Sequence, residues 1–496
     1  MLLSVPNEIL SKITFEADNR TRRRLRRTCK LLNNVATPLV FESVYIDLSW
    51  KRPSGSVLLF LKSLTSGPKL AQHIIRLSLY LPKRFRPTRS WFTSEAKIKK
   101  EEHRRDSFDQ LFIEAIPSMV SLKSLTWRSS GDEGPSYAQL MFEHFGDLPL
   151  LSNLKISSHG TWDIPWSPFR HIRDLKYWGR GANELITFLG YNLHLESIDA
   201  SVWRPLDLSF EDGLPISSLF RSLPPGTYST VKTLRIGGVT FNQLYAHEIP
   251  DLIPHLRCLE NLRVYIPIPN EFWDRLREDD IHLTSLSYCE SNIDSALLSY
   301  LMSYTGLHEL SLGIWDRPTP NSLHNADLLP NVIALSSWCL TKVHIEPDHS
   351  GAWCLDHRML DALVICRGLK SLHVCADKVT TKVEVNNDRV LGALMVLWPN
   401  LWDLNINAVS PSFGFDAVRT AASQIHGRIL AFRFAPLPPE RARLHVSSDF
   451  ATYSVKIHDQ KNNTHSFKVR YLNYYGKKES SRKYKFWRRS DGTNDD

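Results

Sequence analysis

The feature that most constrains the fold is a six-residue phrase, apolar-x-x-apolar-x-apolar, which occurs thirteen times along the chain. Its copies begin at Ile74, Leu122, Leu151, Ile172, Leu195, Val231, Leu259, Leu283, Leu307, Leu340, Leu369, Leu401 and Ile429. From Leu122 to Ile429 there are 307 residues and eleven steps, or about 28 residues per step, within the range of strand–helix solenoid repeats. A stack of such units exposes a long sheet surface, which suits binding better than catalysis.

Each phrase predicts a short β-strand. Its last two apolar positions are two residues apart, so both side chains point to one side of the strand. Such a strand buries its apolar side against neighbouring copies and a following helix. Helix-period stretches with expected aspartate N-caps do lie between the phrases, at 108–115 (Asp106), 297–302 (Asp294), 359–364 and 390–395 (Asp388). This alternation predicts an α/β leucine-rich-repeat solenoid with a parallel sheet on the concave side and helices outside.

The repeat is degenerate. Regular repeats carry an Asn or Cys three positions beyond the strand, where its side chain bonds the turn. Here those positions hold Ser130, His159, Trp203, Pro267, Trp315, Asp377 and Val409. The expected solenoid is therefore irregular, with loops of unequal length.

Size and cysteine usage bound the class of protein. The chain has 496 residues, 42% of them hydrophobic, which is enough for a large core. No apolar run reaches the 18 or so residues that a membrane span needs, and the first eight residues do not resemble a secretory signal. The seven cysteines form no paired framework. A reducing compartment, cytoplasmic and/or nuclear, is expected, with no membrane partner.

The positive charge is local. Residues 456–489 carry eleven Lys/Arg against two acids, and residues 83–105 carry nine against three. Since the formal net charge of the whole chain is +9, the remainder is acidic. We interpret 83–105 as an exposed basic insertion. The tail is predicted to be solvated; an import signal or a nucleic-acid contact are the alternatives for 477–489.

The first fifty residues predict a small helical module. Pro6 and Glu8 suit a helix start, and Ile9, Leu10 and Ile13 make an apolar edge. A second stripe follows at i, i+4, i+7, and Pro38 is expected to end that helix. The stripe consists of Leu25, Cys29 and Leu32, and the alternating residues Phe41, Val44, Ile46 and Leu48 then predict a strand.

This arrangement resembles an F-box, the motif by which substrate receptors bind the Skp adaptor of a cullin-RING ubiquitin ligase. The resemblance rests on Val5-Pro6, the Glu8-Ile9-Leu10 and Ile13 spacing, Cys29-Lys30, and Pro38-Leu39-Val40-Phe41. F-box proteins with leucine-rich repeats, fungal ones above all, share this layout. The resemblance implies adaptor contacts at Val5, Pro6, Ile9, Leu10, Ile13, Leu25, Cys29, Pro38 and Leu39.

The chain departs from the F-box pattern between the two stripes. Five arginines, at 22–24 and 26–27, stand where the family usually has apolar residues. They could weaken adaptor binding, or lie on the solvated side with their stems over the core. The alternative for the whole module is an N-terminal cap that protects the first repeat.

Strand residues beside the inward pair are the candidates for partner recognition. The residues chosen are Arg235, Arg263, Tyr265, Trp178, His344 and His373. Arg235 and Arg263 hold the same place in consecutive repeats and could bind an acidic or phosphorylated segment. Ordinary solvated strand residues are the alternative.

No sequence motif of catalysis or cofactor binding is found. The spacing of Asp348, His349, Cys354, His357 and Cys366 matches no zinc pattern. We therefore expect no metal, no cofactor and no enzymatic activity.

The sequence predicts four segments: an F-box-like module (1–48), a solenoid (49–436), a capping hairpin (437–476) and a basic tail (477–496). The predicted function is that of a substrate receptor, which binds a Skp-family adaptor, through it a cullin, and an unidentified target protein. A ligase-independent scaffold and a nucleic-acid-associated protein are the alternatives.

Overall fold

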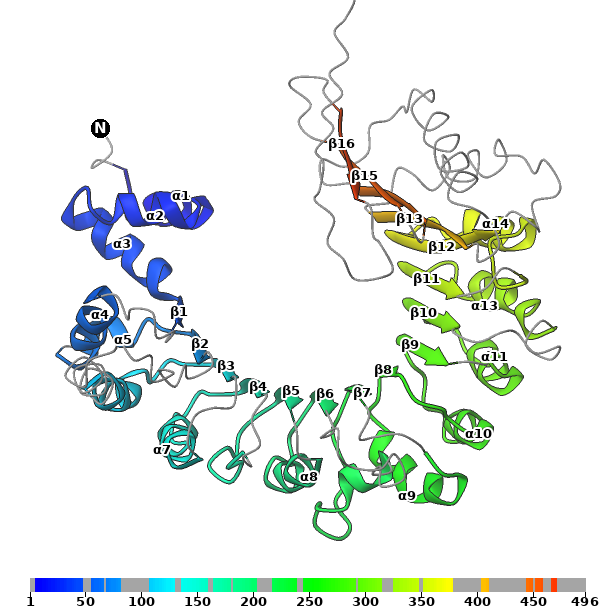
Figure 1. The fold of residues 1–496 in the computed structure, drawn as a ribbon, viewed down its shortest axis with the longest axis horizontal. Coiled ribbons are helices and arrows are strands. Elements are labelled where there is room, and N and C mark those ends of the chain that lie inside the picture. Colours follow the sequence, from blue (N-terminus) through cyan, green and yellow to red (C-terminus); the bar gives the residue numbers. More distant parts are fainter. Residues whose placement is uncertain are drawn as a thin grey trace, which may run out of the picture. The chain divides into compact units, whose positions relative to one another are not determined.

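The computed structural model describes sixteen stretches of the chain (Figure 1). They are residues 5–47, 55–66, 68–81, 107–129, 135–158, 164–179, 182–202, 216–238, 244–290, 293–314, 324–347, 351–377, 403–409, 443–448, 451–457 and 465–470. The basic insertion 83–105 and the tail 477–489 lie outside them. So do the fourth helical stretch, 390–395, and the expected caps Asp106 and Asp388.

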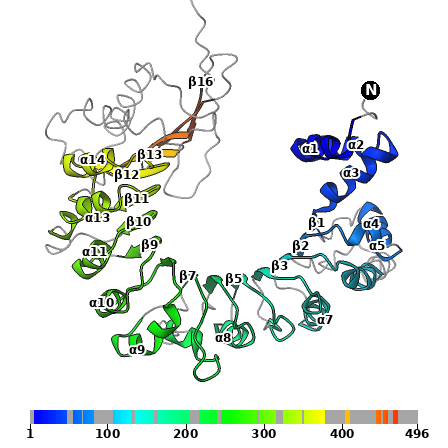
Figure 2. The same cartoon turned by 180° about the vertical axis from the view of Figure 1, so that it is seen from behind.

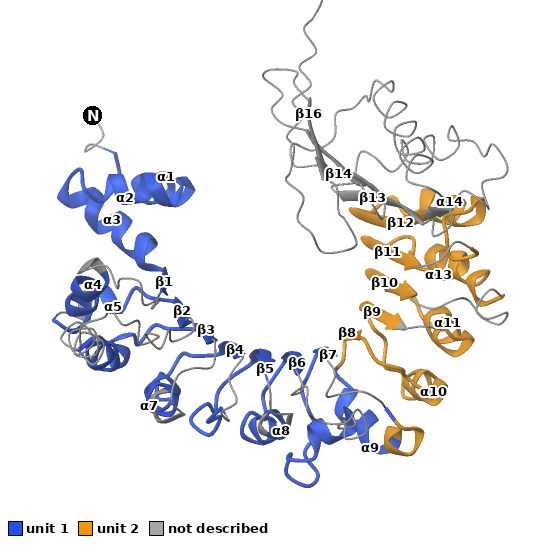
Figure 3. Ribbon diagram, in the orientation of Figure 1, with its two compact units in different colours: residues 1–244, 250–258 blue, residues 245–249, 259–496 orange. Residues whose placement is uncertain are grey.

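The chain divides into two compact units (Figure 3). Unit 1 comprises residues 1–244 and 250–258, and unit 2 comprises residues 245–249 and 259–496. The division falls inside the segment that the sequence predicts to be one solenoid, and the predicted boundaries at 48, 436 and 476 stay predictions. The short helices η5 (Ala246–Glu248), α9 (Ile249–Leu252) and η6 (Ile253–Leu256) occupy the chain at this division.

Unit 1 alternates strands with helices after three N-terminal helices. Its helices are α1 (Asn7–Glu16), α2 (Asn19–Leu25), α3 (Lys30–Phe41), α4 (Gly55–Thr65), α5 (Pro68–Ala71), η2 (Ile116–Ser118), α7 (Pro135–Gly146), α8 (Ala182–Tyr191) and η4 (Ile216–Phe220). Residues 107–115 form a further helix. Its strands are β1 (Ser43–Asp47), β2 (Arg76–Leu81), β3 (Ser124–Ser129), β4 (Asn153–Ser158), β5 (Asp174–Gly179), β6 (Ser197–Val202) and β7 (Thr233–Gly238).

The strands of unit 1 form a parallel sheet in chain order, β1 to β7. The register keeps the repeat phrases aligned: Leu125 of β3 is opposite Leu154 of β4, which is opposite Leu175 of β5. Apolar residues at alternate positions are buried on the side covered by the helices (Figures 1 and 2). The other side carries the polar residues of each strand.

Aromatic side chains fill much of the core of unit 1. The ring of Trp127 on β3 packs against Phe142 of α7 at 4.7 Å, and Phe142 packs against Phe169 at 5.3 Å. Trp166 and Phe169 lie in an irregular turn and are buried, as is Tyr177 of β5. The aromatic-rich repeat is thus mainly a packing feature, although Trp178 points to the polar side of the sheet.

Unit 2 repeats the strand–helix alternation. Its helices are α10 (Asn270–Glu278), α11 (Ser295–Met302), α13 (Leu329–Leu335) and α14 (His357–Val364). Its strands are β8 (Asn261–Val264), β9 (Ser285–Glu290), β10 (Glu309–Ile314), β11 (Lys342–Pro347), β12 (Ser371–Asp377), β13 (Asp403–Val409), β14 (Arg443–Ser448), β15 (Ala451–Ile457) and β16 (His465–Arg470).

The strands of unit 2 also follow the chain order, with a change of direction near the end. Strands β8 to β14 pair parallel, and β14, β15 and β16 pair antiparallel. The antiparallel strands β15 and β16 lie within residues 437–476, the segment for which the sequence predicts a hairpin. The α/β class and the parallel sheet with helices on one side, typical of a repeat solenoid, are confirmed.

Twelve of the thirteen phrases fall on strands, β2 to β13. The thirteenth, at Ile429, lies outside the described residues. The strand that pairs with β13 is β14, at Arg443–Ser448, a segment in which the phrase predicts no repeat. Within the described part of the chain no helix is long and apolar enough to cross a bilayer.

Helix starts differ from the predicted caps. Asp294 precedes α11 as expected, but its side chain makes no capping hydrogen bond. Asp356, which the sequence analysis did not select, does cap a helix, because its carboxylate accepts from the amide of Met359 at 2.8 Å. Asp18 caps α2 in the same way, accepting from Thr21 at 2.7 Å. These bonds satisfy amides that have no partner within the helix.

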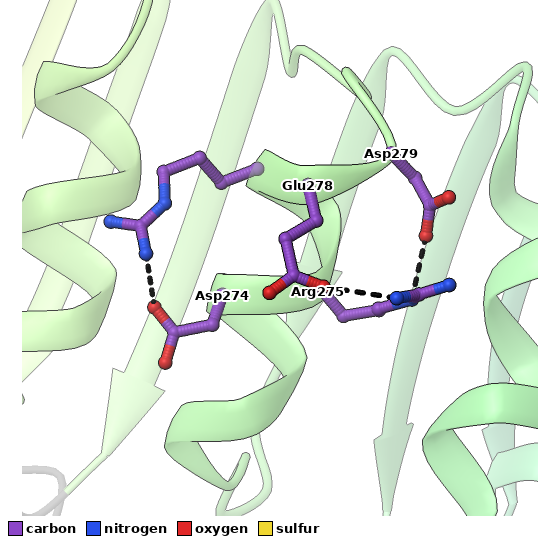
Figure 4. Close-up of polar contacts among 5 residues, drawn as sticks. Asp274, Arg275, Glu278 and Asp279 are labelled. Carbon is purple, nitrogen blue, oxygen red and sulfur yellow. Dashed lines mark hydrogen bonds and ion pairs between the residues drawn. The ribbon is translucent and has the colours of Figure 1, made fainter.

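The end of α10 contains the one non-glycine residue of the described chain with a positive φ, Asp280, at 56°. The amide of Ile281 donates to the carbonyl of Leu276 at 2.9 Å and that of Asp280 to Arg277 at 3.3 Å, the pattern of a Schellman motif. Ion pairs cover the exposed side of this helix (Figure 4): Arg275 contacts Glu278 and Asp279, and Arg277 contacts Asp274.

We expect Asp280→Gly to stabilise the protein. A left-handed conformation is unfavourable for a residue with a Cβ atom, and glycine removes that cost, so the gain should be about 0.5–1 kcal/mol. A higher midpoint of urea unfolding, followed by circular dichroism, would show this gain in stability. The control Asp274→Gly, within the same helix, should lower the midpoint, since glycine inside a helix costs about 1 kcal/mol. A lower midpoint for Asp280→Gly would contradict this account.

Candidate functional site

Two surfaces of unit 1 and one of unit 2 carry the candidate residues. The first is the N-terminal module, α1 to α3. Its interior is formed by Leu10, Leu32 and Ala36, which are buried where α1 packs on α3. The buried Thr14 hydroxyl donates to the carbonyl of Leu10 at 2.7 Å. Leu10 therefore packs in the interior of the module, and its predicted contact with an adaptor stays a prediction.

The outer side of α1 is apolar and exposed. Ile9 and Ile13, one turn apart, are 48% and 52% exposed, and Phe15, which is two residues beyond Ile13 and so points to another side of the helix, is 60% exposed. Apolar residues of this size are usually buried in a helix of a folded domain. A shallow depression of about 380 Å³ adjoins Phe15 and is lined by Ser11, Lys12, Phe15, Val35, Pro38 and Leu39.

The remaining predicted adaptor residues lie at the ends of the three helices or line the depression. Pro6 is the N-cap of α1 and its carbonyl accepts from Ile9 and Leu10 at 3.1 Å. Val5, Leu25, Cys29, Pro38 and Leu39 are half-buried. Of this set, the structure brings Pro38 and Leu39 together with α1, at the depression.

Two expectations for this module are wrong. The stripe of Leu25, Cys29 and Leu32 does not lie on one helix, because Cys29 is extended, with φ of −156°, between α2 and α3. Pro38 does not end a helix: α3 runs through it to Phe41. The proline lacks the amide that would bond the carbonyl of Asn34, but Asn34 is exposed, so water can take that place.

The arginines that replace apolar residues have structural contacts. The Arg22 guanidinium donates to the carbonyls of Thr14, at 3.0 Å, and Phe15, which joins α2 to the end of α1. Arg26 lies over the ring of Phe41 at 4.7 Å. Arg23, Arg24 and Arg27 are exposed. Hence the two best-positioned arginines hold the module together through carbonyl and ring contacts.

The second surface is the polar side of the sheet in unit 1. Thr126, Lys155, Lys176, Asp199 and Arg235 are register partners on β3 to β7. Arg128, Ser157, Trp178, Ser201 and Gly237 form a second row. Arg235 pairs with Asp199 at 3.8 Å, so its charge is compensated. The Lys155 ammonium lies over the Trp178 ring at 4.6 Å.

The third surface is the polar side of the sheet in unit 2. Arg263 donates to the Tyr265 hydroxyl and lies over its ring at 5.1 Å. His344 bonds Glu346 at 3.0 Å, and its ring is 4.9 Å from that of His373 on the next strand. The hydrogen bond from His344 lowers the pKa of the Glu346 carboxyl, and the charges of both histidines add to this.

Arg235 and Arg263, which the sequence predicts to bind an acidic or phosphorylated segment, both have a local partner in the structure, and binding of such a segment stays a prediction. Both are engaged locally, the first by Asp199 and the second by Tyr265, and they belong to different units. Arg128, Lys155 and Lys176, on the polar side of β3 to β5, are not among the residues selected from the sequence. Their regular spacing from the repeat phrase was the signal. Among the described residues no group of acids, histidines and cysteines is arranged to hold a metal ion.

Comparisons with known proteins give little. No protein-family model and no curated protein matches the chain. A solved structure, the crystal structure of the Rad7 and Elc1 complex in yeast, is similar at 15% identity and a TM-score of 0.34. The match covers 84% of this chain and 85% of that one. At this TM-score the likeness carries no argument for fold or function.

Proposed function

We propose that this protein is a substrate receptor of a cullin-RING ubiquitin ligase. In this proposal the N-terminal module binds a Skp-family adaptor and, through it, a cullin, while the sheet surface binds a target protein. The chain itself performs no chemical step. It raises the concentration of the target near a ubiquitin-charged enzyme carried by other subunits.

The observation that carries the proposal is the exposed apolar side of α1. Ile9, Ile13 and Phe15 are uncovered in the described chain, although Leu10 and Thr14 of the same helix are buried. Exposed apolar side chains on one helix, together with a depression lined by Phe15, Pro38 and Leu39 of the same module, are typical of a protein interface. The F-box resemblance of this segment supplies the occupant, the Skp-family adaptor. The contact would include Ile9, Ile13, Pro38 and Leu39.

We expect the double change Ile9→Asp and Ile13→Asp to abolish co-purification of the adaptor. Each isoleucine is half exposed, so burial by the adaptor contributes about 1 kcal/mol per side chain. Carboxylates at the same places would add a desolvation cost. Affinity measured by calorimetry with the purified adaptor should fall at least thirtyfold, which corresponds to about 2 kcal/mol.

The matched control is Val120→Asp with Ile365→Asp. These side chains are 49% and 51% exposed and lie outside the module, so the same charge is added to equally exposed apolar positions. The control should bind the adaptor as the unmodified chain does. Unchanged adaptor affinity in the α1 variant would reject the receptor function and leave a solenoid cap as the role of the module. Equal losses in both variants would also reject it.

A further inference from the structure

A cluster of three cations on neighbouring strands has no established role. Arg128 of β3, Lys155 of β4 and Lys176 of β5 lie on the polar side of the sheet in unit 1. Lys155 and Lys176 are register partners. Arg128 is two residues beyond Thr126, the partner of Lys155. We call these three residues the basic cluster.

The basic cluster is only partly balanced by neighbouring acids: the charge of Lys176 acts on Asp174, two residues away on β5, and the charge of Asp199 acts on Lys155. In the part of the chain that the structure describes, no carboxylate forms an ion pair with Arg128, Lys155 or Lys176, whereas Arg235 on the same side pairs with Asp199. Burial lowers the pKa of Lys155. The charges of Arg128 and Lys176 lower this pKa further, whereas the charge of Asp199 raises it. Lys155 is therefore close enough to both Arg128 and Lys176 to be repelled by each of them, and a bound anion would relieve this repulsion.

One member of the cluster is held in place. The Lys155 ammonium lies 4.6 Å from the centre of the Trp178 ring, a cation–π contact that restricts its side chain. Hydroxyl groups lie at neighbouring positions: Ser157 is on β4, and Thr126 is the register partner of Lys155. Positioned cations with hydroxyl donors at adjacent register positions suit carboxylates.

We propose that the basic cluster binds an extended acidic segment of the target protein, with its Asp or Glu carboxylates against Arg128, Lys155 and Lys176. The identification of the bound segment as part of a ligase target rests on the proposed function. The binding itself does not, because none of these residues belongs to the N-terminal module.

The extent of the cluster favours a peptide over a nucleic acid. Three adjacent strands span about 10 Å from the first to the third, since neighbouring strands lie about 4.8 Å apart. Acidic residues occupy register positions on both sides of the cluster. Asp199 of β6 is the register partner of Lys176. Asp47 of β1 is the partner of Tyr80 on β2, which in turn is the partner of Arg128. A polynucleotide needs a longer basic track for its successive phosphates.

The test uses the full chain and a fluorescein-labelled ten-residue peptide of alternating Glu and Ser, followed by fluorescence anisotropy. The variant with Arg128→Gln, Lys155→Gln and Lys176→Gln should bind this peptide at least tenfold more weakly. Raising NaCl from 50 to 500 mM should weaken binding to the unmodified chain. The same peptide with Gln for Glu should not bind. Lys176→Glu, a single change at an exposed position, should weaken binding as well and provides a second variant if the triple one unfolds.

The matched control removes three cations elsewhere. Arg275→Gln, Arg277→Gln and Lys370→Gln change the net charge by the same amount. Arg275 and Arg277 are already neutralised on α10 (Figure 4). This control should lose less than twofold in affinity. An equal loss in both variants would show non-specific attraction and overturn the proposal.

Other outcomes also decide the matter. Tighter binding of a labelled single-stranded oligonucleotide at the same residues would overturn the peptide assignment, as would binding only of a peptide with phosphoserine in place of Glu. The Ile9→Asp and Ile13→Asp variant separates this proposal from the receptor function. It should lose the adaptor and keep the peptide, whereas the cluster variant should lose the peptide and keep the adaptor.

Discussion

Replacing Trp273 by alanine is expected to cost about 4 kcal/mol of stability, within the range measured for large-to-small changes in protein cores. Trp273 lies on α10 and is 1% exposed. Its ring packs against Phe272 at 5.1 Å, Tyr288 of β9 at 5.6 Å and Tyr300 of α11 at 5.8 Å. The change would leave a cavity among aromatic rings of three elements of unit 2, α10, β9 and α11. The urea midpoint, followed by tryptophan fluorescence and circular dichroism, measures the loss.

Trp338→Ala is the control for this prediction. The same side chain is removed, but Trp338 is 72% exposed, and surface substitutions usually change stability by less than 0.5 kcal/mol in either direction. A solenoid distributes its stability over neighbouring repeats, so the loss in Trp273→Ala should appear in unit 2 first. Similar midpoints for the two variants would contradict the central position assigned to Trp273.

Replacing Asn192 by leucine should cost about 3 kcal/mol, because three buried backbone groups would each lose a hydrogen bond. Asn192 follows α8 directly and is buried. Its Oδ1 accepts from the amide of Ile172 at 3.0 Å, and its Nδ2 donates to the carbonyls of Phe169, at 2.9 Å, and Phe188, at 3.0 Å. Leucine has the same number of side-chain heavy atoms with the same branching at Cγ, so the change removes polar contacts without opening a cavity.

The control for this second prediction is Asn34→Leu, at an exposed position of α3 in the same unit. It should shift the thermal midpoint by a degree or two at most. Hydrogen exchange gives an independent reading: the amide of Ile172 should lose protection in Asn192→Leu and keep it in Asn34→Leu. Retained protection at Ile172 would show that its amide does not depend on this side chain.

The helices were less predictable than the strands. The segments 108–115, 297–302 and 359–364 are helical as expected. The predicted stretches do not include α7, α8 or α10. In α10 the apolar residues Phe272, Trp273 and Leu276 occupy one side of a short, highly charged segment, too brief for its period to stand out. Packing against β9 and α11 stabilises such a helix more than its own sequence does.

The polar contacts of the core were not predictable from the repeat. Regular repeats have an Asn or Cys at a fixed place after each strand, and the corresponding positions of this chain hold other residues. In the structure, Asn192 follows a helix and Asn325 precedes one, where its Nδ2 donates to the carbonyl of Ile293 at 2.9 Å. Both bond backbone groups twenty or more residues away, and no local pattern encodes that distance.

The candidate surfaces were also only partly predictable from the sequence. The sequence correctly placed the strand residues on one side of the sheet, and the apolar edge of α1 was visible in Ile9 and Ile13. It did not show that Leu10 is internal, nor that Asp199 neutralises Arg235. Both facts depend on which side chain of a neighbouring element comes within a few ångströms.

By itself the sequence determined where the strands lie and which side of each is apolar, because both follow from an alternation within six residues. Only the tertiary structure decided which arginines and lysines remain without a carboxylate, and which asparagines satisfy the turns. The physical reason is that ion pairs and buried hydrogen bonds join residues of different repeats, whose approach is set by the packing of strands and helices.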